Sequence, residues 1–448
     1  MLKKIMLYEQ NKMVETIINN SIITNNIEMN KLSIKLSQIF KEIQDIIIAN
    51  PNNIEKIQNT IIDNFWNKIN IIINNTPGIT IGIKDNITKN ELYIYHGKTS
   101  DNYDAPFIDE NTLFDLASVT KLFTATRLLK EQEQGNINLN NNLNYYLPEY
   151  KNINVSLIDI SKFYYQINTN GRLDTATNYK ELITRLYNSY IAIENTNIYS
   201  DIPYILLGET LHAINSNFQK IFNQELKMTN TTYNPINSII TGSTKDNYNQ
   251  IHDPKARIMT YYGFKELGHA GLYSTSQDLI KLSSNLLPNS NFLTNKSLKI
   301  LRTPSKNKYQ FYNNKTNNIS NKNRAMGVYI QTNKGIHESD IAIESSKETF
   351  ASAGKTGSYI LIDPTNNYTF NYLTNPYSQE KGCPIITVNN HKQNWAEITN
   401  ILKEELMNLV YELRYTSNIF DTLAQIQNQE QIKLTTNKLI KSPKIIKR

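Results

Sequence analysis

Residues 113–123 read Leu113-Phe114-Asp115-Leu116-Ala117-Ser118-Val119-Thr120-Lys121-Leu122-Phe123, and the fold and chemistry expected of this chain follow from them. Ser118 and Lys121 stand three positions apart, where apolar residues begin to recur at helical spacing. Positions i and i+3 share one face of a helix, so the Lys121 amine can reach the Ser118 hydroxyl. A serine hydroxyl needs a base to become a good nucleophile, and a desolvated lysine can be that base.

Spacing alone does not identify a catalytic serine, because the Ser-x-x-Lys pattern occurs elsewhere in the chain. Ser118 differs in opening an apolar helix directly after an apolar segment, while the other three pairs stand among loop residues. The start of a helix also offers N–H groups where an oxyanion would form. The three other pairs are Ser305 with Lys308, Ser352 with Lys355, and Ser378 with Lys381.

These residues resemble the serine β-lactamase and penicillin-binding-protein superfamily, in its class C-like branch of β-lactamase-related serine hydrolases. The family pattern is Ser-x-x-Lys, then Tyr-x-Asn, then Lys-Thr-Gly. The resemblance runs from about Thr76 to about Leu413. Three further stretches carry it: Asn197-Ile198-Tyr199-Ser200-Asp201 with the apolar run to Gly208, Gly268-His269-Ala270-Gly271-Leu272-Tyr273-Ser274, and Ala353-Gly354-Lys355-Thr356-Gly357-Ser358-Tyr359 before Asp363-Pro364.

The second element departs from the family pattern, because Asp201 stands where the commoner residue is Asn. An amide can donate to a substrate carbonyl, whereas an ionised carboxylate only accepts, so the departure bears on substrate preference. Asp201 also precedes an Ile-Pro pair, a pattern typical of a helix N-cap, and a substrate contact, a cap or both remain open. Literal Tyr-x-Asn also occurs at Tyr150 and Tyr312, but only Tyr199 is followed by an apolar, helix-like run.

The resemblance implies a reaction through an acyl-enzyme. Ser118 would attack a substrate carbonyl, Lys121 would take the proton, and Tyr199 would relay it to the leaving group. Backbone N–H groups of Ser118 and Ser358 would form the oxyanion hole. If Lys355 also lies beside Tyr199, two ammonium groups share one site, and Lys121 should titrate below an ordinary lysine.

The same resemblance places the third element on a strand and assigns substrate binding to it. Lys355 and Thr356 would bind a carboxylate or a similar anion, and Gly357 would let the backbone approach closely. Taken alone, Lys-Thr-Gly is typical of a turn, and the ordered set of motifs favours the functional interpretation. His269, within a run of small residues, is expected to be structural rather than a base.

The expected fold is an α/β (α+β) sandwich, with an antiparallel sheet flanked by helices and a mostly helical second region over about 118–300. Apolar residues alternate at 79–83 and again near 92–95, which predicts two paired strands. Strands near 326–333 and 358–374 should join the same sheet. The segment from Trp395 to Leu413 is expected to be the closing helix.

Three parts are expected along the chain: a helical extension over 1–50, a β-lactamase-related domain over 51–413, and a helical, basic tail over 414–448. Apolar residues at helical spacing recur in 32–47 and again in 54–72. Packing on the main domain or on a partner helix explains them better than a membrane anchor. Oligomerisation through these terminal helices is therefore one expected use of the extensions.

Composition narrows the partners of this chain of 448 residues. The net charge is +7, but Lys and Arg are scattered rather than clustered with aromatic residues, so no nucleic-acid partner is expected. Cys383 is the only cysteine, which precludes an intrachain disulfide, and neither a metal nor another cofactor is expected. No apolar run suggests a signal peptide or a membrane span, and a cytoplasmic protein is expected.

The leading hypothesis is a serine hydrolase acting on a small molecule or peptide with a carbonyl and an anionic group. An ester, a D-amino-acid amide or a β-lactam would fit. The alternative is a catalytically idle relative that is used for binding or assembly. The sequence leaves open which acyl group is cleaved, and whether water or another acceptor receives it.

Overall fold

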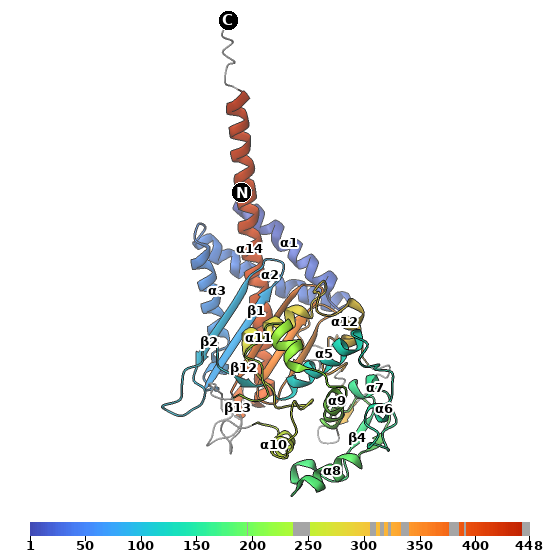
Figure 1. Ribbon diagram of the computed structural model, residues 1–448. Helices are drawn as coiled ribbons and strands as arrows, with labels where there is room; N and C mark the ends of the chain where they lie inside the picture. Colours follow the sequence, from blue (N-terminus) through green and yellow to red (C-terminus); the bar gives the residue numbers. More distant parts are fainter. Residues whose placement is uncertain are drawn as a thin grey trace.

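A six-stranded antiparallel sheet lies at the centre of the protein, with strand order β2-β1-β12-β11-β10-β9 (Figure 1). The structure, a computed structural model, describes residues 1–194, 196–235, 251–304, 311–313, 318–320, 324–332, 340–375, 385–388 and 391–440. The strands are β1 Gly78–Asp85, β2 Glu91–Gly97, β9 Tyr329–Ile330, β10 Phe350–Ala353, β11 Ser358–Asp363 and β12 Tyr368–Thr374.

The alternation of side chains along these strands gives the sheet two buried faces. Ile79, Ile81 and Ile83 of β1 point to the face that is covered by the terminal helices. Gly82 points to the opposite face, where an added Cβ would lie 2.4 Å from Ser276 Oγ. The predicted sheet is confirmed, since β1 pairs with both β2 and β12, and β11 pairs with β12.

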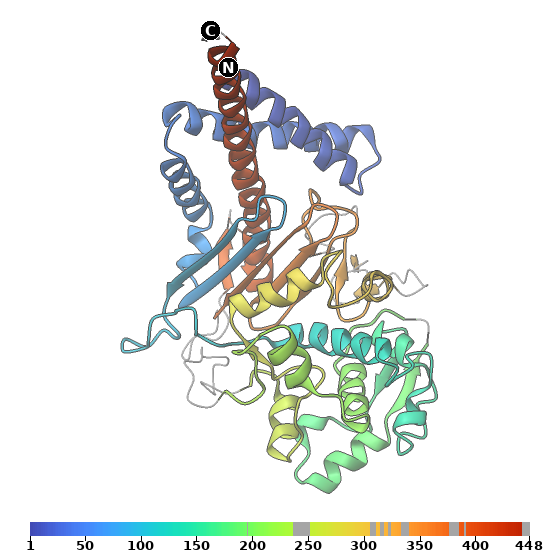
Figure 2. The same cartoon turned by 45° about the horizontal axis from the view of Figure 1, so that its top comes forward.

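The first face of the sheet is covered by helices from both ends of the chain (Figures 1 and 2). The closing helix α14 begins at Trp395 as expected but continues to Ile440, so its predicted end at Leu413 is wrong. No glycine or proline interrupts that stretch, and nothing local ends the helix. The other helices here are α1 Leu2–Asn20, α2 Asn26–Ala49, α3 Ile54–Lys68 and α4 Asn70–Ile73.

Polar contacts anchor α14 to the sheet and to the N-terminal helices. Arg414 makes a two-pronged, buried ion pair with Asp85 of β1, with N···O distances of 2.8 and 2.7 Å. The Tyr415 hydroxyl donates to the main-chain oxygen of Met6 at 2.8 Å. The helices of residues 1–50 therefore share one hydrophobic core with the sheet and α14.

The opposite face of the sheet carries α11 and, beyond it, the predicted helical region (Figure 2). This region holds the second hydrophobic core. Its helices are α5 Thr120–Glu133, α6 Leu143–Tyr146, α7 Leu157–Ser161, α8 Tyr179–Tyr187, α9 Ile202–Ala213, α10 Pro254–Tyr261, α11 Ser276–Asn285 and α12 Asn295–Arg302, with 3₁₀ turns η1 Ala117–Val119 and η2 Leu173–Thr175 and the π-helical η3 Gln219–Glu225.

Short strand pairs complete the described part of the chain. The pairs are β3 Phe114–Asp115 with β6 Tyr273–Ser274, β4 Gln166–Asn168 with β5 Tyr190–Ile193, β7 Phe311–Asn313 with β8 Asn318–Ser320, and β13 Ile385–Val388 with β14 His391–Asn394.

Among the described residues, none of the helices combines the length and the apolar character needed to cross a bilayer.

Candidate active site

Ser118 lies in the 3₁₀ turn η1, between strand β3 and helix α5. The chain enters this turn in a fixed position, because the Leu116 N–H donates to the Leu272 carbonyl at 2.9 Å. Ala117 then adopts a φ of +44°, in the left-handed region that costs a non-glycine residue about 1 kcal/mol or more. The Ala117 N–H donates to Asp115 Oδ1 at 2.7 Å, which holds this strained conformation.

The turn between β10 and β11 packs directly against the main chain before Ser118. The Thr356 hydroxyl donates to the Asp115 carbonyl at 2.6 Å, and the Ser358 hydroxyl donates to the Leu116 carbonyl at 2.8 Å. Both hydroxyls are buried and bind the protein itself. Thr356 and Ser358 thus help to fix the position of the serine turn.

Ser118, Lys121 and Tyr199 come together as the sequence predicts. Lys121 Nζ lies 3.1 Å from Ser118 Oγ, and the Tyr199 hydroxyl lies 2.5 Å from the same oxygen. The Lys121 ammonium also lies 4.9 Å from the centre of the Tyr199 ring. Lys121 is 1% exposed and Tyr199 is 37% exposed, so one partner of Ser118 is buried while the other reaches the surface.

Asp201 occupies the N-cap position of α9, but its side chain makes no capping hydrogen bond. Its Oδ1 lies 2.8 Å from Lys121 Nζ, and its Oδ2 lies 3.0 Å from Lys255 Nζ. The carboxylate therefore bridges two ammonium groups. The sequence left open whether Asp201 caps the helix, contacts the substrate or does both. Asp201 stands at the cap position, but its side chain binds the two lysines and does not cap α9.

The charge of Lys121 differs from the expectation. Burial opposes the ammonium form, but Tyr199 and Asp201 outweigh burial and raise the pKa of Lys121 above that of an ordinary lysine. The prediction of a lowered pKa is wrong, because the sequence did not reveal the salt bridge from Asp201. Burial likewise opposes the Asp201 carboxylate, but Lys121, His269 and Lys255 hold the pKa of Asp201 well below its usual range.

His269 supports Lys121 through its main chain. Its carbonyl accepts a hydrogen bond from Lys121 Nζ at 3.0 Å, while its buried ring lies 3.2 Å from Asp253 Oδ1. Asp253 also caps α10, accepting from the Ala256 N–H at 2.8 Å. Burial opposes the Asp253 carboxylate, but His269 and Lys255 lower the pKa of Asp253 to about 2. The ring of His269 is thus directed at Asp253, in keeping with a structural role.

A narrow cavity opens beside Ser118. Its volume is about 10 Å³, the lower limit for a single water molecule. Arg324 brings a second cation to it, since the guanidinium lies 5.3 Å from the ring centres of both Tyr199 and Tyr329. The described residues lining the cavity are Ser118, Lys121, Phe163, Tyr199, Arg324, Gly327, Val328, Tyr329, Ser352 and Ala353.

The structure does not bring Lys355 to this cavity. Strand β10 ends at Ala353, and Lys355 lies exposed in the turn that follows. Gly354 and Gly357 close the turn, with the Gly357 N–H donating to the Gly354 carbonyl at 3.0 Å and Gly357 at a φ of +85°. The expectation that Lys-Thr-Gly lies on a strand is therefore wrong, and Ser352 is the β10 residue that faces the cavity together with Ala353.

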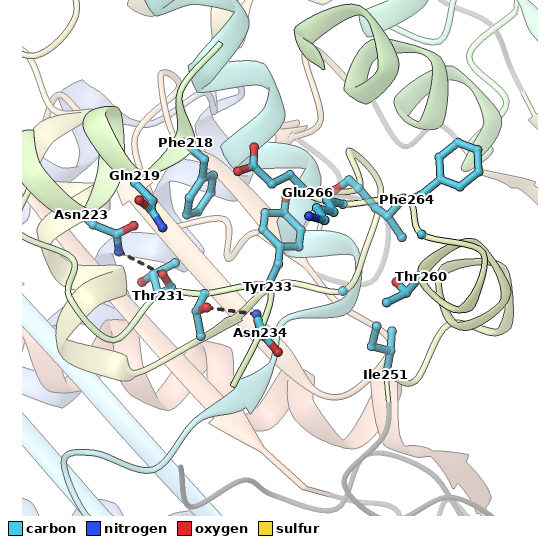
Figure 3. Close-up of a pocket in the computed structure, with 15 residues that line it drawn as sticks. Phe218, Gln219, Asn223, Thr231, Tyr233, Asn234, Ile251, Thr260, Phe264 and Glu266 are labelled. Atoms are coloured by element: carbon cyan, nitrogen blue, oxygen red, sulfur yellow. Dashed lines mark hydrogen bonds between the residues drawn. The ribbon is translucent and has the colours of Figure 1, made fainter. Parts of the chain in front are cut away.

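A larger cavity, of about 430 Å³, lies elsewhere in the helical region (Figure 3). Tyr233 stands in its wall beside Phe218, with ring centres 5.2 Å apart, and donates to the Leu267 carbonyl at 2.9 Å. Glu266, on the same wall, pairs with Arg127 at 2.8 Å. Ser118 does not line this cavity, so its size does not make it the site of the chemistry.

The sequence patterns did not identify two charged residues of the site, Lys255 and Arg324. Lys255 follows an Asp-Pro pair that signals a helix start, but this signal does not reveal the contact with Asp201. Arg324 directly precedes Ala325 in a run without a local motif. Within the described residues, no group of three or more His, Cys, Asp and Glu side chains is arranged to hold a metal ion.

The sequence is similar to a known family and to known proteins. A family model described as Beta-lactamase matches residues 87–382. The chain is 24% identical over 319 residues to a protein of Escherichia coli (strain K12) named "Putative D-alanyl-D-alanine carboxypeptidase", covering 60% of this chain and 70% of that protein. It is 27% identical over 220 residues to a beta-lactamase of Psychrobacter immobilis, covering 46% of this chain and about half, 52%, of that protein.

Solved structures share the fold at low identity. A class C beta-lactamase matches with a TM-score of 0.57 and 17% identity, over 78% of this chain and 96% of that one. EstCE1, described as a hydrolase with promiscuous acyltransferase activity, matches with a TM-score of 0.59 and 13% identity, over 78% of this chain and 99% of that one.

Proposed function

This chain belongs to the β-lactamase family, and from that membership we propose that it is a serine hydrolase that forms an acyl-enzyme on Ser118. One observation carries the proposal: Ser118 Oγ lies within hydrogen-bond reach of both Lys121 Nζ and the Tyr199 hydroxyl, at 3.1 and 2.5 Å. A nucleophile with a proton acceptor in contact is the arrangement that acyl transfer needs. The substrate is an ester, a D-amino-acid amide or a β-lactam.

The proton of Ser118 passes first to Tyr199. The Tyr199 hydroxyl is the nearer partner, and in its ionised form it accepts the proton as Ser118 Oγ bonds to the substrate carbonyl. Tyr199 then delivers the proton to the leaving group. Lys121, kept charged by Asp201, stabilises the negative charge that is shared between the two oxygens.

The new oxyanion needs donors on the other side of the carbonyl. The Ser118 N–H, at the start of α5, is one proposed donor. The second proposed donor is the main-chain N–H of Ser358, as the family resemblance implies. The hydroxyl hydrogen bonds of Thr356 and Ser358 support this, because they bring the turn that precedes β11 against the serine turn. Water or another acceptor then releases the acyl group from Ser118.

Arg324 replaces Lys355 as the proposed partner of an anionic group on the substrate. Its guanidinium borders the cavity, while Lys355 lies in the exposed turn. One N–H donates to the Asn197 carbonyl at 3.1 Å, and no carboxylate pairs with the guanidinium among the described residues. A guanidinium presents further N–H donors in a fork that suits a carboxylate.

Covalent labelling tests this function. The purified protein is incubated with a fluorophosphonate and, separately, with a fluorescent penicillin, and its intact mass is measured. We expect one adduct on the wild type, no adduct on Ser118→Ala, and an unchanged adduct on Ser283→Ala, a buried serine of α11 that does not line the cavity. Absence of any adduct on the wild type would favour the idle, binding or assembly alternative.

A further inference from the structure

Lys255 lies on the first turn of α10 and contacts the oxygen of Asp201 that Lys121 does not contact. Its Nζ lies 3.0 Å from Asp201 Oδ2 and 3.7 Å from Asp253 Oδ2, and its side chain is 29% exposed. The charges of Lys121, Asp201, Lys255 and Asp253 thus alternate in sign along one line of contacts. Asp201 is the only member that touches both lysines among these described contacts.

Two consequences follow for Asp201. With a partner on each oxygen and no capping bond to α9, its carboxylate is held in one orientation by the two lysines. The positive charge of Lys255 also offsets part of the negative charge of Asp201, so Asp201 attracts Lys121 less strongly than in an isolated pair. Removing Lys255 would release the Oδ2 side of the carboxylate and strengthen the hold of Asp201 on the Lys121 proton.

We propose that Lys255 is a positioning residue for the reaction: it fixes Asp201 against Lys121 and limits how strongly Asp201 retains the proton of Lys121. This inference rests on the proposed function, in which Tyr199 and the charged Lys121 act on Ser118 as one electrostatically coupled set. Lys255 acts on that set through Asp201 and does not touch the substrate.

The charged groups around the line support this role. Lys255 faces Asp201 before α9, Asp253 at the start of its own helix, and Asp174 of η2. Burial opposes its charge, but these carboxylates raise the pKa of Lys255 above the ordinary value. On the other side, His269 faces both Asp201 and Asp253, and Tyr199 faces Lys121.

The test compares Lys255→Met with Lys255→Arg and with a matched control. Lys281→Met removes a similar ion pair, between a lysine of α11 and the buried Asp278 at 2.8 Å, away from the cavity. The rate at which the fluorophosphonate phosphonylates Ser118, with loss of fluoride, is measured against pH. We expect Lys255→Met to raise the apparent pKa of this reaction by about one unit, Lys255→Arg to restore it, and Lys281→Met to leave it unchanged.

A second background separates positioning from mere stabilisation. If Lys255 acts through Asp201, adding Lys255→Met to Asp201→Asn should have little effect. At each pH the rates of the double variant and of Asp201→Asn should differ by less than about twofold. A Lys255→Met enzyme that loses thermal stability but keeps the wild-type pH profile would overturn the inference. An equal shift in both backgrounds would also overturn it, because the effect would then bypass Asp201.

Direct titration of Lys121 tests the role of Lys255 without any substrate. The Lys121 ammonium is followed by NMR in protein labelled at lysine, and its signal is assigned with Lys121→Met. An upward shift of its titration in Lys255→Met supports the inference, and no shift refutes it. A wild type that is never acylated would refute the proposed function, while this titration would still decide whether Lys255 acts on Lys121 through Asp201.

Discussion

Replacing Asp201 by Asn should move the pH dependence of acylation downward. Asp201 Oδ1 lies 2.8 Å from Lys121 Nζ, a distance at which two unit charges attract by about 6 kcal/mol at an effective dielectric constant of about 20. Desolvation and Lys255 offset part of this attraction. Opposite charges at such range typically shift a pKa by about 1–3 units, and we expect the apparent pKa of acylation to fall by that amount.

The same substitution should change how stability depends on pH. The raised pKa of Lys121 contributes stability below the pKa of an unfolded lysine, and this is lost as pH rises through the folded value. The depressed pKa of Asp201 contributes stability above the pKa of an unfolded aspartate, and this is lost as pH falls through the folded value. Asp201→Asn removes the second contribution and reduces the first, to which Tyr199 also contributes, so its stability should vary less at the acid and alkaline ends.

Two measurements decide the matter. The rate at which a fluorophosphonate phosphonylates Ser118, a reaction that needs the same activated serine, is measured across pH for the wild type, Asp201→Asn and the control Asp278→Asn, which weakens the matched pair with Lys281. Urea unfolding at each pH gives the stability of the same proteins. An Asp201→Asn enzyme whose profile stays in place or moves upward would refute the electrostatic role assigned to Asp201.

Three further predictions concern the substrate, the closing helix and the sheet. Arg324→Met should raise KM for esters that carry a carboxylate about tenfold or more with little effect on neutral esters, whereas Lys355→Met should affect both less; equal losses for the two variants would contradict the assignment. Arg414→Ala should leave Asp85 buried without its partner and lower the free energy of unfolding by about 3–5 kcal/mol in urea, and a loss below about 1 kcal/mol would show that the pair is dispensable. Gly82→Ala should lower the melting temperature, since its Cβ would lie 2.4 Å from Ser276 Oγ, and an unchanged melting temperature would mean that α11 shifts freely.

Local patterns and the order of motifs predicted the sheet and the centre of the site. The alternating isoleucines of β1 fixed its buried face, and Ser118 and Lys121 are neighbours on one turn of chain. Tyr199 required the family pattern, because 81 positions separate it from Ser118. The full length of α14 could also have been predicted, since its sequence lacks glycine and proline up to Ile440.

The remaining features depended on contacts that no local pattern encodes. Lys-Thr-Gly suits a strand or a turn, and only the end of β10 at Ala353 places Lys355 in the turn. Lys255 is 54 positions from Asp201, on another helix, so their ion pair follows from how α9 and α10 approach each other. The raised pKa of Lys121 depends on the same packing and was therefore predicted with the wrong sign.

The two hydroxyl hydrogen bonds from the β10–β11 turn affect how mutational data on this protein should be interpreted. Thr356 and Ser358 hold the carbonyls of Asp115 and Leu116, directly before the strained Ala117. Truncating either hydroxyl would let the serine turn relax, and the turnover number would fall although no substrate contact was lost. An alanine scan scored on activity alone would then count both residues as substrate ligands. Binding of an unreactive substrate analogue, measured beside turnover, separates a misplaced nucleophile from a lost contact.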